Sequence, residues 1–459
     1  MTGQIRASAA LVSLLALTAP AAAQTPNNPF FGSAPQGTAT AESLPLSLKD
    51  AVERALKYNL GLLLQEESVK TAHGARWRAL AGLLPNVSAL ASASRQVINL
   101  DAYGFPAEPS IIGPFNVFDA RVYLSQPIVD LRALNDARAA SANERAEKLG
   151  VRSARDLVTL VAVNLYLETV AATSRIEATQ AQQATAEALL KQASDMKASG
   201  VVAGIDVLRA QVQLQNQRLR TIGAENDLEK TKLQLARAIG LPSGQTFTLT
   251  DRIPYAPLAD VSLDSVLKTA WENRADYLAA RERLAAAEAS QRAATQDHLP
   301  TVHMDADYGT LGQSPSDSHS TYRVAATLRV PIFDAGRSTG RRLESEAELN
   351  RRRAELEDLR GRVEYDVRAA LLDLRAASQQ LEAAQATVTL AAQELDQARD
   401  RYAAGVAGSL EVTQAQQSVA VASETYISAL YAHNLAKASL ARAAGTAEQS
   451  VMSFLGGSR

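Results

Sequence analysis

The 459-residue sequence contains no cysteine, few aromatic residues and almost no net charge. The absence of cysteine excludes disulfide bonds, Cys-ligated zinc or iron–sulfur sites, a thiol nucleophile and a lipid anchor attached through cysteine. The 47 basic and 49 acidic side chains give none of the concentrated positive charge that nucleic-acid binding requires. Aromatic residues make up only 5% of the chain, whereas alanine is abundant. This composition suits long, closely packed helices.

The N-terminus has the pattern of a secretory signal peptide over residues 1–23. An apolar run from Ala7 to Ala19 follows Arg6, and small residues at 21–23 form a cleavage site. The segment 24–45 is rich in Pro, Gly, Thr and Asn and is expected to be a flexible lead-in. No later stretch reaches the roughly 20 apolar residues of a membrane-spanning helix. The sequence therefore predicts an exported protein that is not an inner-membrane helical protein.

The most informative feature is an internal repeat, with one copy at 46–240 and the other at 261–445. Matching segments recur in the same order: LSLKDAVERA and VSLDSVLKTA, Leu84-Pro85 and Leu299-Pro300, Gln126-Pro127 and Val330-Pro331, and Gly200–Val207 and Gly405–Val412. Chance similarity of alanine-rich helices would not keep Pro and Gly in order, so two copies of one unit are predicted. A Pro-containing linker is expected at 241–260, and a C-terminal tail at 446–459.

Within each repeat the hydrophobic period changes from helical to alternating at a proline. Alternation of apolar and polar residues predicts one β-hairpin at about 87–128 and another at about 301–332. Four prolines mark the junctions of helices and strands: Pro85, Pro127, Pro300 and Pro331. Such strands suit a transmembrane barrel, but a soluble antiparallel sheet with one wet face alternates in the same way. Four strands cannot close a barrel, so a membrane barrel would require an oligomer.

The rest of each repeat predicts one long helix and two shorter ones. The long helices, about 135–199 and 334–404, each reach about 100 Å, and the shorter ones, such as 46–84, about 55 Å. A rod is predicted in which a long helix lies beside two short helices stacked end to end. Apolar residues recur every seven positions from Val367 to Tyr402, with alanine between them, which is typical of coiled coils. Gly200 and Gly405 are predicted to end the long helices in the left-handed conformation.

The duplicated unit, the Leu-Pro strand starts, the Pro-Ile-Val/Phe-Asp strand ends and the Gly…Asp/Glu-Val turns resemble the outer-membrane efflux protein family, the TolC-like exit ducts, over about 44–446. The resemblance implies a mainly α-helical homotrimer with a small β part. A long coiled-coil helical barrel would cross the periplasm, and a transmembrane β-barrel, with four strands from each chain, would lie in outer-membrane lipid. It also implies a passive exit duct of a tripartite efflux or type I secretion system. An inner-membrane pump would drive drugs, metals or secreted substrates through it by way of a periplasmic adaptor, with no cofactor.

The resemblance assigns roles to the two turns that join long and short helices. These tip turns would form the periplasmic aperture and contact the adaptor, and they contain Gly200, Val201, Gly204, Ile205, Gly405, Val406, Gly408 and Leu410. Asp206 and Glu411 match the acidic constriction, which would place six carboxylates around the pore of a trimer. Tyr402 matches the gate-region tyrosine.

The chain also departs from the family's pattern at the tips. Lys197 holds the position equivalent to Tyr402, and Ala407 stands where the best-known member has a gating arginine. Arg209 and Gln414 lie one turn beyond the two acids. These departures leave the details of gating open.

Plainer structural interpretations compete with several of these roles. A carboxylate in the first turn of a helix is favoured by the helix dipole whether or not it lines a pore, and both roles can hold for the two acids. His303, Asp305 and Asp307 share one polar strand face, which favours a solvated lumen surface over a metal site. His433 lies on an alanine-flanked heptad seam and is expected to be a packed core residue.

Two other classes of protein compete with the duct. A soluble periplasmic adaptor or structural coiled-coil protein would carry one long helical hairpin beside a soluble β-domain, whereas this chain has two repeats that each include an amphipathic hairpin of strands. An exported enzyme has no support, because the sequence has neither a phosphate-binding loop nor a nucleophile–base set. The substrate, the pump and the adaptor are not specified by the sequence.

Overall fold

The computed structural model describes residues 28–106, 108–251 and 261–454, and the predicted signal peptide lies outside these ranges. The first repeat contains α1 (Leu48–Tyr58), α2 (Leu60–Ala81), β2 (Asn86–Asn99), β3 (Ile111–Val129), α3 (Leu131–Ala198) and α4 (Gly204–Ala238). The second contains α5 (Leu263–Asn273), α6 (Ala275–Thr295), β5 (Thr301–Ser314), β6 (Asp317–Arg329), α7 (Arg337–Ala403) and α8 (Ser409–Ala443). The predicted mainly helical fold with an internal two-fold repeat is confirmed.

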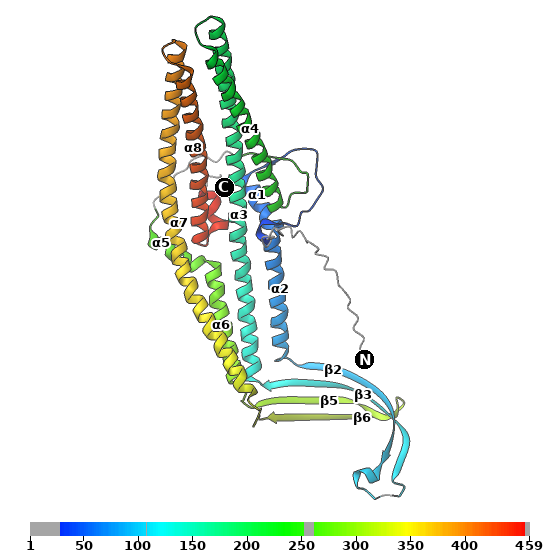
Figure 1. Cartoon of the computed structure of the whole chain (residues 1–459). Helices are drawn as coiled ribbons and strands as arrows, with labels where there is room; N and C mark the ends of the chain where they lie inside the picture. Colours follow the sequence, from blue (N-terminus) through cyan, green and yellow to red (C-terminus); the bar gives the residue numbers. More distant parts are fainter. Residues whose placement is uncertain (1–27, 107, 252–260, 455–459) are drawn as a thin grey trace, which may run out of the picture.

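The helices form an elongated shaft around the two long helices (Figure 1). Helix α3 lies beside α2 and α4, which are stacked end to end, and α7 lies beside α6 and α8. The two repeats meet where α3 contacts α8 in the upper half of Figure 1 and α6 in the lower half. The helices therefore follow the order α7–α8–α3–α4 above and α7–α6–α3–α2 below. This order leaves a long edge at α2 and α4 and another at α7.

The helix predicted at 46–84 is broken into two, which corrects the sequence-based expectation. Asn59 separates α1 from α2 with an extended backbone, and Arg274 separates α5 from α6 in the same way. The Asn59 Oδ1 accepts hydrogen bonds from the backbone N–H groups of Gly61 and Leu62, at 2.9 and 3.3 Å. This capping starts a new helix at a residue that a helical pattern alone does not mark as a break.

A glycine packs against each of the two helix breaks. One glycine follows α4 and the other follows α8. Gly240, after α4, has φ +71°, and Gly445, after α8, has φ +73°. A Cβ at Gly240 would lie 2.5 Å from the Tyr58 Cβ, and one at Gly445 would lie 2.6 Å from the Arg274 backbone nitrogen. Glycine is therefore favoured at both positions for two reasons. The backbone is left-handed there, and a side chain would clash with the neighbouring helix break.

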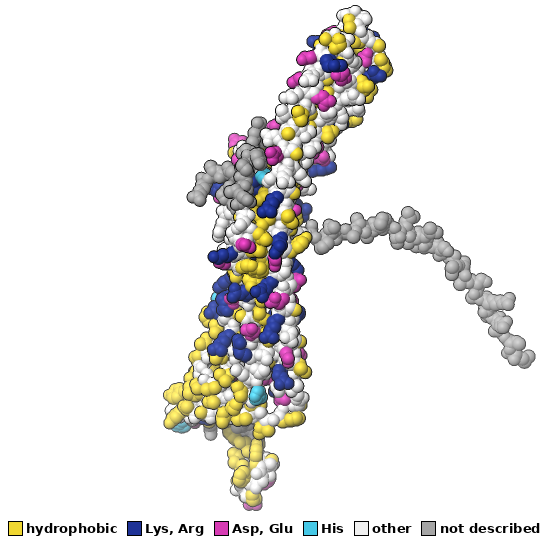
Figure 2. Space-filling view, turned by 90° about the vertical axis from the view of Figure 1, so that its left-hand side faces the viewer, with side chains coloured by type: hydrophobic (Ala, Val, Ile, Leu, Met, Phe, Trp, Pro, Cys, Tyr) yellow, Lys and Arg dark blue, Asp and Glu magenta, His cyan; other side chains and the backbone are white. Residues whose placement is uncertain are grey.

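The four long strands form one antiparallel sheet in the order β2-β3-β5-β6 at the lower end of the shaft (Figure 1). Val122 pairs with Tyr308 and Tyr308 pairs with Tyr322, so these side chains lie on one apolar face. Tyr308 and Tyr322 are 64% and 78% exposed. Figure 2 shows hydrophobic side chains gathered at this end, whereas charged side chains cover the shaft above. The prediction of four strands with one apolar face is confirmed, and β2 and β6 are the edges.

Three segments outside the two predicted repeats pack against the shaft. β1 (Leu44–Leu46), from the expected flexible lead-in 24–45, pairs in parallel with β4 (Phe247–Leu249), from the expected linker 241–260. α9 (Ala447–Phe454), from the expected tail, lies against α3 and α8. Each of these segments is too short for its apolar residues to show a helical or alternating period in the sequence. The expected flexible lead-in therefore contains a paired strand, and the described parts of the expected linker and tail contribute a strand and a helix.

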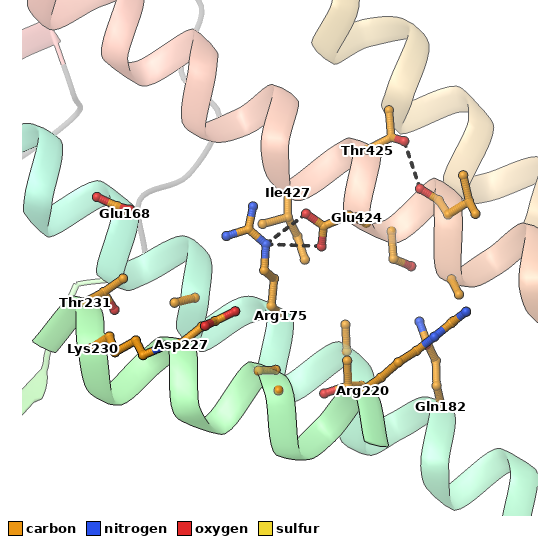
Figure 3. Close-up of a pocket in the computed structure, with 18 of the residues that line it drawn as sticks. Glu168, Arg175, Gln182, Arg220, Asp227, Lys230, Thr231, Glu424, Thr425 and Ile427 are labelled. Carbon is orange, nitrogen blue, oxygen red and sulfur yellow. Dashed lines mark hydrogen bonds and ion pairs between the residues drawn. The ribbon is translucent and has the colours of Figure 1, made fainter. Parts of the chain in front are cut away.

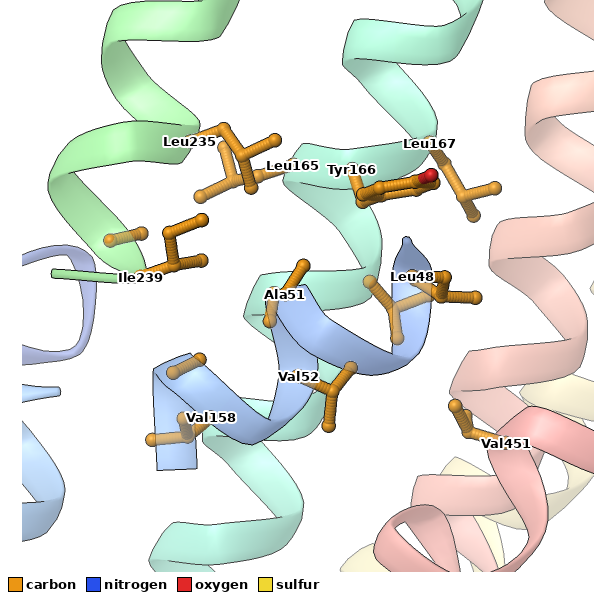
Figure 4. Close-up of a cluster of buried hydrophobic side chains, with 14 of the residues drawn as sticks. Leu48, Ala51, Val52, Val158, Leu165, Tyr166, Leu167, Leu235, Ile239 and Val451 are labelled. Atoms are coloured by element: carbon orange, nitrogen blue, oxygen red, sulfur yellow. The ribbon is translucent and has the colours of Figure 1, made fainter. Parts of the chain in front are cut away.

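The largest apolar cluster joins the two repeats at the middle of the shaft. Figure 4 shows Leu48 of α1 next to Tyr166 of α3, and Val52 of α1 and Val451 of α9 belong to the same cluster. The Tyr166 hydroxyl donates to the Leu46 carbonyl at 3.2 Å, and burial raises the pKa of Tyr166. Contrary to expectation, one window of α3 is long and apolar enough for a membrane-spanning helix, but more than half of it is buried inside the chain.

The heptad seam predicted for α7 is buried against α8. Its buried members are Val367, Leu374, Leu381, Leu395 and Tyr402, with Ala370, Ala377, Ala384, Ala391 and Ala398 between them. His433 of α8 is fully buried, and its Nδ1 lies 3.3 Å from the Ser378 Oγ. The expectation of a packed core histidine is confirmed.

Candidate functional site at the helical tips

The first tip turn ends α3 with two backbone hydrogen bonds. Gly200 has φ +75° and donates its N–H to the Lys197 carbonyl at 3.0 Å. The Val201 N–H donates to the Met196 carbonyl at 2.9 Å. This pair of bonds is the Schellman motif, which requires a left-handed residue and therefore favours glycine.

The second tip turn repeats that geometry at the end of α7. Gly405 has φ +72° and donates to the Tyr402 carbonyl at 3.0 Å, while the Val406 N–H donates to the Arg401 carbonyl at 3.0 Å. The left-handed glycines predicted from the sequence are confirmed in both repeats. The turns place Gly204 and Ser409 at the first positions of α4 and α8, whose N-cap residues make no side-chain capping hydrogen bond.

Asp206, in the first turn of α4, links the two tips. Its Oδ1 accepts a hydrogen bond from the Ser409 Oγ of α8 at 2.5 Å and lies 3.5 Å from the Arg209 Nη1. Ser409 is buried, and the Asp206 side chain is 17% exposed. A hydrogen bond to an ionised carboxylate is stronger than one between neutral groups. The structure thus brings the first repeat's predicted aperture acid into contact with the second repeat.

Glu411 makes a separate contact within its own hairpin. Its Oε1 lies 3.0 Å from the Nε of Arg401 in the last turn of α7, and both side chains are about half exposed. Arg401 was not among the residues predicted from the sequence. The available signal was its place in a last helical turn, where the helix dipole favours a cation. Both predicted aperture carboxylates therefore have a cationic neighbour in the same chain.

Tyr402 lies beneath the turns and not on the open surface, since it is 2% exposed. It belongs to an apolar cluster with Leu189 and Ala193 of α3 and Val412 of α8. Its hydroxyl has no hydrogen-bond partner within the described part of the chain. Burial raises the pKa of Tyr402, and the negative charge of Asp206 adds to this effect. Tyr402 thus packs between the two hairpins and stabilises the contact between them.

The outer surfaces of the turns expose apolar side chains. Val201 and Ile205 are 61% and 50% exposed, and Val406 and Leu410 are 69% and 54% exposed. Gly204, Gly408 and Ala407 add no bulk to these surfaces. An exposed apolar patch of this kind is typical of a protein-contact site.

The polar strand face carries cross-strand contacts. The Asp305 Oδ1 accepts from the Ser125 Oγ at 2.7 Å, and Asp307 lies between Arg121 at 2.8 Å and Arg323 at 3.4 Å. Across the described ranges, no group of three or more His, Asp or Glu side chains is placed to hold a metal ion. The two acids of the polar face are therefore engaged in the sheet itself.

A charged groove lies between α3, α4 and α8 below the tips (Figure 3). It encloses about 780 Å³. The Arg175 Nε lies 2.9 and 3.1 Å from the two carboxylate oxygens of Glu424, and Arg220 donates to the Gln417 Oε1 at 3.1 Å. These contacts join residues far apart in the sequence, so no local motif predicted them.

Comparisons with known proteins place these features among outer-membrane proteins. A family model described as outer membrane efflux protein matches residues 51–241 and 266–446. Outer membrane protein TolC of Vibrio cholerae is 24% identical over 92% of this chain and 96% of its own length. The pyoverdine export outer membrane protein OpmQ of Pseudomonas aeruginosa is 26% identical over 88% of this chain and 86% of its own length.

A solved structure has the same fold. The crystal structure of a membrane protein from Pseudomonas aeruginosa superimposes with a TM-score of 0.77 at 21% sequence identity. The match covers 90% of this chain and 98% of that chain. The fold described above, including both repeats, is therefore shared with that protein.

Proposed function

The chain belongs to the outer membrane efflux protein family, and we propose that it works as a trimeric exit duct closed at the periplasmic end by contacts between its two helical tips. Proteins of this family are outer-membrane channels of efflux and secretion systems, and this chain is such a channel, extending from the outer membrane into the periplasm.

The two free edges are the observation that supports a closed ring. Edge strand β2 leads from α2, and edge strand β6 leads into α7. The α2/α4 edge of one copy can therefore meet the α7 edge of the next along both sheet and shaft, a head-to-tail contact that closes into a ring. Two copies would give eight strands, whose interior is filled by side chains, whereas three give twelve and leave room for a passage.

Exposed leucines on the two helical edges lie at matching heights. Leu219 and Leu233 of α4 are 67% and 70% exposed, and Leu390 and Leu372 of α7 are 65% and 64% exposed. Counted from the tips, Leu233 and Leu372 lie about 44 Å and about 47 Å down the shaft, and Leu219 and Leu390 about 23 Å and about 20 Å. These residues form two level pairs for an interface between neighbouring copies.

Cysteine cross-linking tests the ring directly, because the chain has no cysteine of its own. Leu233→Cys with Leu372→Cys, or Leu219→Cys with Leu390→Cys, should produce covalent trimers on oxidation in outer-membrane preparations. The mismatched pair Leu219→Cys with Leu372→Cys is the control, since its positions differ in height by about 24 Å. Equal cross-linking of matched and mismatched pairs, or a monomer by light scattering, would reject the proposed ring.

The tip contacts support a gate that acts by holding the hairpins together. Asp206 with Ser409 bridges the two repeats, and Arg401 neutralises Glu411 beside it. The paired carboxylates would attract cations less than six isolated ones. We therefore expect Arg401→Gln to increase the cation selectivity of single channels, because Glu411 would lose its partner. If the cation selectivity of Arg401→Gln is unchanged, Glu411 does not line the passage.

The exposed apolar tips support contact with a periplasmic adaptor. Val201, Ile205, Val406 and Leu410 present apolar surface on turns that the Schellman bonds hold rigid. The adaptor would pack against this surface and favour the separated arrangement of the tips, and an inner-membrane pump would supply the solute. Val406→Asp should weaken co-purification with the adaptor, whereas the same change at exposed Val421 of α8, away from the tip and from both proposed edges, should not.

A further inference from the structure

One charged side chain interrupts the apolar face of the strand sheet. Arg95 of β2 pairs with Asn116 of β3 and lies on the same face as Ala93, because side chains alternate along a strand. Among the described residues that pair between the bulges of the sheet, Arg95 is the only charged one on this face. The other charged residues of that part of the sheet, such as Arg121 and Asp307, lie on the polar face.

Arg95 lies where the apolar band of the sheet ends. On this face, Tyr308 and Tyr322 are followed away from the shaft by Thr310, and Arg95 with Asn116 lies further out still. At ~3.3 Å per residue and a strand tilt of about 40°, Arg95 is about 23 Å from the start of β2. The apolar band of a membrane barrel is about 25 Å tall, so Arg95 is level with the lipid headgroups at its far edge.

The Arg95 side chain has no partner within the chain. It is exposed, and no residue in the described ranges forms an ion pair or a hydrogen bond with its guanidinium. On the polar face, by contrast, Arg121 and Arg323 lie 2.8 and 3.4 Å from the Asp307 carboxylate. A guanidinium surrounded by hydrocarbon is costly, so a long side chain at such an edge extends towards the headgroups. The partner of Arg95 therefore comes from outside the chain.

We propose that Arg95 binds a phosphate group of the anionic lipid of the outer leaflet, such as lipid A. The shaft extends into the periplasm, so the end of the sheet that points away from it reaches the outer leaflet (Figure 1). A guanidinium can hold a phosphate through two parallel hydrogen bonds. The exposed amide of Asn116, which pairs with Arg95, supplies a further donor. The apolar residues nearer the shaft contact the acyl chains of the same lipid.

The inference rests on the proposed duct, because it requires the apolar face of the sheet to lie in lipid. The test titrates the full-length protein, purified in detergent, with diphosphoryl lipid A and counts bound lipid by native mass spectrometry. Arg95→Gln should bind this lipid about fivefold more weakly than the wild type. Lipid A without phosphates should bind both proteins equally through its acyl chains, and an excess of inorganic phosphate should not displace the phosphorylated lipid.

The failures of the two proposals give different results. Equal affinity of the wild type and Arg95→Gln for diphosphoryl lipid A would overturn the role of Arg95 and leave the duct standing. Displacement of the lipid by inorganic phosphate would also overturn that role, because the site would then take free phosphate. If neither form of lipid A binds, the sheet does not face lipid, and the proposed duct fails together with this inference.

A matched control removes the same charge from the other face. Arg323→Gln should bind diphosphoryl lipid A like the wild type, because Arg323 lies on the polar face. An equal loss of affinity in this variant would show a general effect of net charge and would overturn the assignment to Arg95.

A carboxylate of a neighbouring copy is the competing partner for Arg95. Asp317 lies at the turn between β5 and β6, and β6 of one copy would meet β2 of the next in the proposed ring. Asp317→Asn should leave lipid binding unchanged if the lipid is the partner. A gain of affinity that disappears when Arg95 is also replaced would mean that the two side chains pair between copies, and it would overturn the proposal.

Discussion

The two helical hairpins end in the same turn but bury different kinds of side chain. The α3/α4 hairpin contributes large apolar residues to the central cluster, including Leu165, Tyr166 and Leu235. The α7/α8 hairpin alternates leucine with alanine along its seam, which lets the helices approach closely. Both hairpins bury amide side chains, Asn135 and Gln217 in the first and Gln416 and Asn434 in the second.

Unsatisfied polar atoms sharpen this difference. In the described part of the second hairpin, the Tyr402 hydroxyl, both polar atoms of Gln416 and the Asn434 Oδ1 are buried without a hydrogen-bond partner. The first hairpin has two such atoms, on Thr159 and Gln217. Each costs about 1–3 kcal/mol when buried. Within the single chain, the second hairpin therefore carries more of this cost than the first.

The largest expected effect separates the two buried tyrosines. Tyr166→Ala should lower the free energy of unfolding by about 3–5 kcal/mol, because it leaves a cavity in the central cluster. Tyr166→Phe should cost about 1 kcal/mol through loss of the bond to Leu46, whereas Tyr402→Phe should cost nothing, since that hydroxyl has no partner among the described residues. Guanidinium unfolding followed by circular dichroism measures both. Equal costs for the two Phe variants would contradict the comparison.

The next effect concerns the bond that joins the hairpins at their tips. Ser409→Ala removes the donor to Asp206, and a hydrogen bond to a charged group contributes about 1.5–3 kcal/mol. The ratio of open to closed channels in planar bilayers should therefore rise by about tenfold or more. Thr413→Ala is the matched control on the same helix, because its hydroxyl donates to the Ser409 carbonyl of its own helix and not to Asp206. An unchanged open fraction in Ser409→Ala would show that this bond does not hold the gate.

The two tip glycines should respond equally, in spite of the difference between their hairpins. Gly200→Ala and Gly405→Ala each force a Cβ into the left-handed conformation, at a cost of about 1–2 kcal/mol. No heavy atom lies within 4 Å of the added Cβ at either position in the described structure, so the backbone alone sets the cost. Thermal unfolding of the two variants tests this. A much larger loss at one glycine would mean that a partner contacts that turn.

These turns were predictable from the sequence, whereas the contacts across them were not. Gly200, Gly405 and the junction prolines restrict the backbone locally, so their spacing alone marks helix ends and strand starts. The helix breaks at Asn59 and Arg274 were missed, because neither residue breaks a helix by itself. Asn59 starts α2 through its own side-chain cap, whereas Arg274 makes no such cap and its break coincides with the close approach of Gly445.

The candidate site follows the same division. The sequence marked Asp206 and Glu411 by their place after each turn. The Ser409 partner of Asp206 depends on how the two hairpins meet, which no local pattern encodes, whereas Arg401 lies in the same hairpin as Glu411 and had only the weak signal of a cation in a last helical turn. The charged groove between α3, α4 and α8 was missed because it also depends on how the hairpins meet.

The smallest expected effect tests whether the buried amides weaken the second hairpin. Gln416→Leu replaces an amide that has no hydrogen-bond partner in the described structure with an apolar side chain of similar size. Removal of that desolvation cost should leave the free energy of unfolding unchanged or raise it by about 1 kcal/mol. Leu381→Ala on the facing helix is the contrasting variant, and it should cost about 2–5 kcal/mol because it removes a fully packed side chain from the seam. A loss of stability in Gln416→Leu would mean that the amide is satisfied in the assembled channel. The weaker seam would then be a property of the single chain, and the neighbouring copy would supply what the second hairpin lacks.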